Sequence, residues 1–130
     1  MEIQLAAHET HSIHAYSEHS IIVHGQTYSQ SLRINRQHIH FPWNVTTLNT
    51  LTPADLDVLL SEGPDIILIG HTTLQHAPVA IINALSQQRI GFECMSIGAA
   101  CRTFNILLGE KRKVSLGIIF PADDKSASPF

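Results

Sequence analysis

The sequence predicts a single α/β domain over residues 1–130, with a β-rich first half followed by a second half in the order βαβαβ. The apolar run Ile66–Ile69 stops at Gly70, as a buried strand does. A helical pattern follows at 78–89 and a second apolar strand at 92–97. A strand that ends at glycine and returns through a helix to another strand is a βαβ unit, whose strands run parallel. Hydrophobic residues make up 44% of the chain and charged residues 15%, so one core can form.

The first half reads as short strands joined by turns. Residues 20–23 are rich in β-branched side chains, Gly25-Gln26 provides a turn, and 27–34 continues the pattern, so we expect a hairpin. Ile39 and Phe41 alternate with histidines, which predicts a further strand with one face in water.

The second half opens with a capped helix. Thr52 is the predicted N-cap, Pro53 takes the first helical position, and Asp55 lies three residues after the cap. Leu56 begins the apolar stripe, and Gly63-Pro64 ends the helix. We expect these further elements in order: a strand at 65–69, a helix at 78–89, a strand at 92–97, a helix at 99–108, and a strand at 113–120, with loose termini at 1–11 and 121–130.

The candidate site lies where the parallel strands end. Ligands and partners of βαβ units gather at the carboxyl ends of the strands. One predicted strand is followed by Gly70-His71-Thr72, and the helix after the next strand opens with Gly98. The face of that helix opposite its apolar stripe carries further polar side chains. The candidate ligand- or partner-binding residues are therefore Gly70, His71, Thr72, Gly98, Arg102 and Asn105.

Arg102 has two interpretations. It lies in the first turn of a predicted helix, where the helix dipole disfavours a cation. An anion, a carboxylate or an acidic group of a partner would compensate this charge. The other interpretation is that Arg102 pairs with Glu93 or reaches water, as single surface charges commonly do.

The histidines do not predict a metal site. His8, His11 and His14 are spaced by three, a spacing that brings their nitrogens together on neither a strand nor a helix. His38 and His40 share one strand face, but no Cys, Asp or Glu follows nearby in sequence as a third ligand. We therefore predict no metal.

No motif for catalysis or for a cofactor is present. His71 occupies a position where a general acid or base could act, but no Gly-x-Ser-x-Gly nucleophile motif accompanies it. The glycines match neither G-x-G-x-x-G nor a Walker spacing, so no cofactor is predicted. Cys94 and Cys101 are expected to pack as small apolar residues.

Charge and cysteine content exclude several classes of protein. A formal charge of −3, with Lys111–Lys113 as the only basic run, argues against a nucleic-acid binder. No apolar run approaches the ~18 residues of a membrane span. Two cysteines and no apolar leader predict a reducing, cytoplasmic location.

Several segments together resemble the Mth938-like family. They are Leu68–Gly70, Gly91–Met95, Ala99–Leu107, Tyr28–Leu32 and Pro42-Trp43. The string Ala-Ala-x-Arg-Thr-aromatic-Asn within them is fairly specific. The family was long catalogued as a domain of unknown function and includes the mitochondrial complex I assembly factor 3. The resemblance implies a compact three-layer α/β domain without settled enzymatic activity.

This chain departs from the family at one point. The family usually continues the strand end as Gly-Thr-Gly, whereas Gly70-His71-Thr72 stands here. A ligand that needs close approach of the backbone at the second glycine is therefore in doubt.

The resemblance favours a non-catalytic protein-interaction or assembly module, with respiratory complex assembly as its setting and a protein as its partner. The alternative is a binder of a small anionic ligand, or an enzyme, that uses the crevice between Gly70 and Gly98. A closed pocket of converging polar groups would favour the alternative, and an open surface beside an apolar patch would favour the module. The sequence leaves open whether the chain forms a homo-oligomer.

Overall fold

The computed structural model describes residues 11–122. The predicted loose termini fall almost entirely outside this range and stay predictions.

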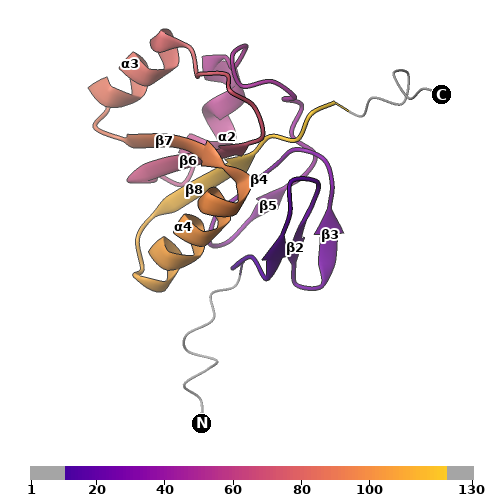
Figure 1. The fold of residues 1–130 in the computed structure, drawn as a ribbon. Coiled ribbons are helices and arrows are strands. Elements are labelled where there is room, and N and C mark those ends of the chain that lie inside the picture. The colour runs from indigo at the N-terminus through magenta and orange to yellow at the C-terminus, as the bar shows by residue number, and fades with distance from the viewer. Residues whose placement is uncertain (1–10, 123–130) are drawn as a thin grey trace, which may run out of the picture.

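Residues 11–122 form two sheets and four helical segments. Figure 1 shows their arrangement. A three-stranded antiparallel sheet has the order β1-β2-β3, and a five-stranded mixed sheet has the order β5-β4-β8-β6-β7. The strands are β1 (Ala15–Tyr16), β2 (Ile21–Val23), β3 (Gln26–Tyr28), β4 (Leu32–Ile34), β5 (Ile39–His40), β6 (Ile66–His71), β7 (Gly91–Ser96) and β8 (Val114–Ile118). The helical segments are the 3₁₀ turn η1 (Pro53–Leu56), α2 (Asp57–Leu60), α3 (Val79–Gln87) and α4 (Ile97–Gly109).

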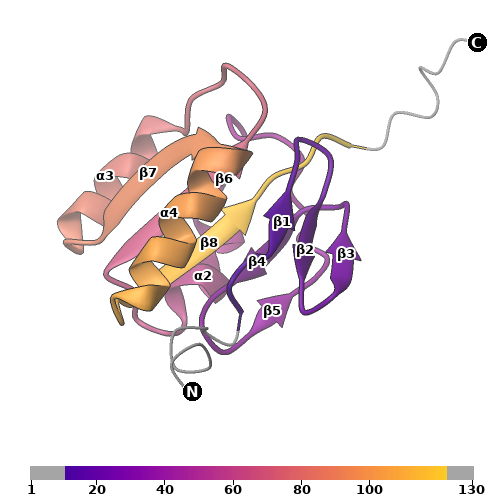
Figure 2. The same cartoon turned by 60° about the horizontal axis from the view of Figure 1, so that its bottom comes forward.

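The layers are those of an α/β domain, and the predicted fold class is confirmed. Helix α4 and the small sheet lie on one face of the five-stranded sheet, and α2 and α3 lie on the other (Figures 1 and 2). The parallel pairs β6–β7 and β6–β8 form the predicted βαβαβ half. Because side chains of a strand alternate between faces, Leu68 enters the core under α4, while Ile67 and Ile69 enter the core under α3.

The predicted hairpin is confirmed only as far as Tyr28. Strands β2 and β3 pair antiparallel, but the expected continuation to residue 34 is wrong. The chain leaves the small sheet after Tyr28, and β4 pairs with β8 in the other sheet. Ser31 fixes this crossing, since its hydroxyl donates to the Phe120 carbonyl (3.3 Å) and accepts from the Phe120 amide (2.9 Å).

Helix boundaries follow the capping residues. The predicted Thr52 cap is confirmed: its hydroxyl accepts from the Asp55 amide, and the Asp55 carboxylate accepts from the Thr52 amide. The helix expected at 99–108 begins at Ile97 instead, because Ser96 is its cap and accepts from the Ala99 amide at 3.3 Å. The earlier start ends β7 at Ser96, one residue before the predicted end of that strand.

Phe104→Ala should lower the free energy of unfolding by ~3–5 kcal/mol, the usual cost of emptying a fully buried aromatic site. Phe104 is 0% exposed and packs in the core that holds Leu68, as predicted. Urea denaturation measures the change. Ile106→Ala, on the outer face of α4, is the matched control and should change stability by less than about 0.5 kcal/mol. A loss below about 1 kcal/mol at Phe104 would contradict this account of the helix face.

Candidate functional site

A hollow of about 610 Å³ lies at the carboxyl ends of β6 and β7. Its walls are the end of β6 and the residues after it, with His71 and Thr72; the start of α4, with Gly98; and the end of β1 and the turn after it, with Tyr16. The structure therefore brings together three of the predicted site residues, His71, Thr72 and Gly98, and places them on an open crevice.

His71 is used to fold its own loop. The Thr73 amide donates to His71 Nδ1 at 3.2 Å, and the Thr73 hydroxyl lies at the same distance from that nitrogen. Thr73 in turn accepts from the Gln75 amide at 3.1 Å. Burial, and secondarily the charge of His76, lowers the pKa of His71 below its ordinary value. His71 is therefore a neutral acceptor at pH 7, with its Nδ1 occupied by its own loop.

Gly70 makes room for a helix rather than for a ligand. The residue is buried, and a Cβ at this position would lie 2.9 Å from Ala100 Cβ and 3.2 Å from Ile97 Cα. The missing side chain therefore lets α4 approach the end of β6. Gly98, at the start of α4, has a similar role toward the small sheet, since a Cβ there would lie 3.1 Å from the Tyr16 ring.

Arg102 contacts a tyrosine of the same chain. Its Nη1 donates to the Tyr16 hydroxyl at 2.9 Å, and the guanidinium carbon lies 5.8 Å from the centre of that ring. Within residues 11–122, no ion pair joins Arg102 to Glu93. The Arg102 side chain does not line the crevice.

Asn105 fastens the segment before β1 to α4. Its Nδ2 donates to the Ile13 carbonyl at 2.9 Å, and its Oδ1 accepts from the Ile13 amide at 2.8 Å. The side-chain amide thus makes the two backbone hydrogen bonds to Ile13 that a neighbouring strand would otherwise make. Ile13 itself is buried. Like Arg102, Asn105 lies outside the walls of the crevice.

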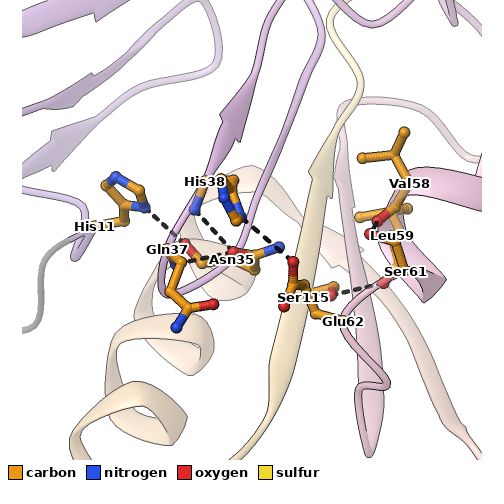
Figure 3. A network of polar contacts seen from close by, with 9 residues as sticks. All are labelled: His11, Asn35, Gln37, His38, Val58, Leu59, Ser61, Glu62 and Ser115. Carbon is orange, nitrogen blue, oxygen red and sulfur yellow. Dashed lines mark hydrogen bonds and ion pairs between the residues drawn. The ribbon is translucent and has the colours of Figure 1, made fainter.

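Several histidines gather at the far end of β4, as Figure 3 shows in part. His38 lies 3.4 Å from a Glu62 oxygen, and His11 Nδ1 donates to the Asn35 carbonyl at 2.9 Å. His24 packs edge-on against the His11 ring. In the part of the chain that the structure describes, no three His, Cys, Asp or Glu side chains are placed to hold a metal ion.

Both cysteines have raised thiol pKa values because they are buried. The pKa of Cys94 is raised to about 11 and that of Cys101 to about 12. Cys101 is fully buried, as predicted, whereas Cys94 is half-buried beside a second hollow.

Sequence reasoning missed the parts of the site that come from outside the βαβ unit. Tyr16 ends β1, and Ser17 and Glu18 follow it in the turn. They reach the crevice only because the small sheet packs against α4. Leu74 is 97% exposed in the loop after β6. An apolar residue in a polar loop is visible in the sequence, and this signal could have added Leu74 to the predicted surface.

Known proteins resemble this chain over most of its length. A family model described as "Protein of unknown function (DUF498/DUF598)" matches residues 13–119. The "13 kDa major membrane protein" of Francisella tularensis subsp. holarctica is 32% identical over 84 residues, which cover 64% of this chain and 68% of that protein.

Solved structures share the fold. A Xanthomonas campestris protein superposes with a TM-score of 0.78 at 31% identity, covering 87% of this chain and 86% of that one. An outer membrane protein from Bartonella henselae gives 0.72 at 28% identity, covering 88% and 99%. A Bordetella pertussis protein described as a Mth938-like domain gives 0.73 at 20% identity, covering 92% of each chain. In residues 11–122, no helix has the length and hydrophobicity needed to cross a membrane.

Asn105→Ala should destabilise the domain by ~1–3 kcal/mol, because it leaves the buried amide and carbonyl of Ile13 without partners. Hydrogen exchange should rise first at Ile13 and then at the β1 segment. Thermal denaturation and exchange measured by NMR test both effects. An unchanged exchange rate at Ile13 would show that Asn105 does not hold this segment.

Lowering the pH from 7.5 to 5.5 should destabilise the fold. The pKa values of His11, His40 and His71 lie below the ordinary 6.5, with burial as the first cause at each. The histidines of the unfolded chain bind protons near pH 6.5, whereas the same histidines in the folded chain bind protons only at lower pH. The free energy of unfolding is therefore highest above that pH, and it falls as the pH drops through the lowered pKa values.

Urea denaturation at several pH values measures this dependence, and His71→Gln is the matched variant that should show a smaller fall. A stability that stays constant or rises toward pH 5.5 would contradict the assignment.

Proposed function

This chain belongs to the DUF498/DUF598 family of Mth938-like domains, and since family membership brings no specific function with it, we propose that the chain is a non-catalytic protein-interaction module. The surface that we assign to the partner is the corner formed by the crevice and the loop after β6. Leu74, at 97% exposure, is the observation that carries the proposal.

The exposed leucine does not stand alone. Val79 is 69% exposed and Ile82 is 44% exposed, and both lie on α3 directly after this loop. Leu74 and Ile82 also line one hollow of about 420 Å³. Single exposed apolar side chains are ordinary on protein surfaces, but a group of large ones beside a concavity is typical of a site for another protein.

The charges of the crevice support a protein over an anion. Glu18 contributes a negative charge to its wall, and His71 is neutral at pH 7. The nearest cation of α4, Arg102, is bonded to Tyr16. Among residues 11–122, no cation lines the hollow to meet an anionic ligand, whereas a polypeptide can use the hydroxyl and backbone groups of its walls.

Two relatives have names that refer to membranes, the Francisella "13 kDa major membrane protein" and the Bartonella outer membrane protein. Together with the resemblance to a family that includes an assembly factor of a respiratory complex, these names support a partner that belongs to a membrane-associated assembly. The cytoplasmic location expected from the sequence stays a prediction beside them.

Leu74→Ser should weaken partner binding at least ~10-fold, as the loss of a central apolar contact does. The test compares immobilised wild type, Leu74→Ser and Ile106→Ser in a lysate of the cells that produce the chain, followed by titration of the purified partner. Ile106 is 60% exposed on another face, so Ile106→Ser removes the same kind of side chain as a matched control.

Equal affinity of the purified partner for wild type, Leu74→Ser and Ile106→Ser would overturn the assignment of this surface to the partner. The anionic alternative has its own signature: phosphate or malonate would shift the backbone amide resonances of Ile97 and Gly98, at the start of α4, and leave those near Leu74 unchanged.

A further inference from the structure

Strand β7 forms one edge of the five-stranded sheet, and no strand within residues 11–122 pairs with its outer side (Figure 1). The Gly91 amide donates to the Asp65 carbonyl at 2.9 Å, so this residue directs its backbone groups toward β6. Because backbone groups alternate along a strand, Phe92 and Cys94 direct theirs outward. Within residues 11–122, these outward groups have no backbone or side-chain partner.

The two edges of this sheet differ in their protection. At the other edge, β5 is only two residues long and is followed after Phe41 by Pro42. Strand β7 runs for six residues in unbroken register with β6, without proline, and carries Glu93 as its single charge. Natural sheets protect free edges by short strands, bulges, prolines or several charges. The β7 edge lacks these devices and is available for pairing.

The surroundings of the edge differ between its two faces. On the α3 face, Ile82, Phe92 and Cys94 line the hollow of about 420 Å³. A strand added ~4.8 Å beyond β7 would direct every second side chain toward this hollow. On the α4 face, Glu93 is exposed and would lie across from the intervening side chains of the added strand.

We propose that β7 binds an extended segment of the partner protein by strand addition. This segment carries apolar side chains at alternate positions toward α3 and a lysine or arginine across from Glu93. The proposal rests on the proposed function, that the chain binds a protein, and it adds a second contact beside the Leu74 corner.

A second copy of this chain does not fit the same edge. Helix α3 packs on β7 itself (Figure 2). If two β7 edges paired around a twofold axis, both copies of α3 would lie on one face of the joint sheet. The two helix axes would then be only about as far apart as two paired strands, ~4.8 Å. Packed helices need 8–10 Å, so a lone extended segment fits where a whole domain does not.

The probe for the test is the peptide acetyl-Lys-Ile-Lys-Val-Lys-Ile-Lys-amide, titrated into the isotope-labelled full chain. Two control peptides have the same residues in the order Lys-Lys-Ile-Ile-Val-Lys-Lys, or glutamate in place of every lysine. The alternating lysine peptide should slow hydrogen exchange of the Phe92 and Cys94 amides at least about tenfold. The reordered peptide should leave them unchanged, and the glutamate peptide should bind at least about tenfold more weakly.

A matched pair of variants removes only the outward hydrogen bond. Cys94→Pro lacks the amide that faces away from β6, so no bond within the sheet is broken. Cys94→Ala loses the same thiol and keeps the amide. The alternating peptide should bind Cys94→Ala like wild type and Cys94→Pro at least about tenfold more weakly, with folding checked by circular dichroism.

The outcomes separate the two proposals. Exchange protection confined to residues away from β7, or equal peptide affinity of both Cys94 variants, overturns strand addition. If Cys94→Pro fails to fold, protection of Phe92 and Cys94 in the wild type decides instead. If a purified partner binds Cys94→Pro normally but loses affinity for Leu74→Ser, the edge contact is overturned and the proposed function stands. If the partner binds both variants with wild-type affinity, both proposals are overturned.

Discussion

The burial of β6 on both faces is the constraint on which the rest of the domain depends. Ile67 and Ile69 fill the core under α3, Leu68 fills the core under α4, and all three are 0% exposed. Parallel neighbours on both sides, β8 and β7, use the backbone groups of β6 completely. Because both faces and both sides of this central strand are in contact with other elements, only its ends and the outer edges of the sheet can bind a partner. Both surfaces that we assign to a partner lie there.

The end of β6 owes its shape to Gly70. A side chain at this position would collide with Ala100 and with the Ile97 backbone, so the glycine sets how closely α4 approaches the sheet. Ser96, the last residue of β7, caps the helix, and the crevice opens just beyond it. Beyond Gly70, the Thr73 amide donates to His71 Nδ1 and folds the chain into a compact loop. This loop carries Leu74 outward.

The polar face of α4 joins the two halves of the domain. Arg102 bonds to Tyr16 and Asn105 to Ile13, so residues that resemble a ligand site in sequence hold the small sheet in place. Because α4 begins at Ile97, Arg102 lies in its second turn and not in the first, so the expected unfavourable position of this charge is wrong. The use of Arg102 and Asn105 within the domain leaves the crevice with hydroxyl groups and Glu18 as its main polar features.

The sequence by itself determined the βαβαβ order, the Thr52 cap, the buried face that holds Phe104 and the location of a crevice after Gly70. These features depend on local patterns: apolar periodicity, capping residues and strand ends marked by glycine. Tertiary structure alone decided that β4 leaves the hairpin to join β8, that Tyr16 accepts the bond from Arg102, and that β7 ends the sheet with a free edge. Each of these features depends on contacts between residues that are distant in the chain. Composition and spacing do not encode such contacts, because strand order and side-chain partners are fixed only when the two cores pack together.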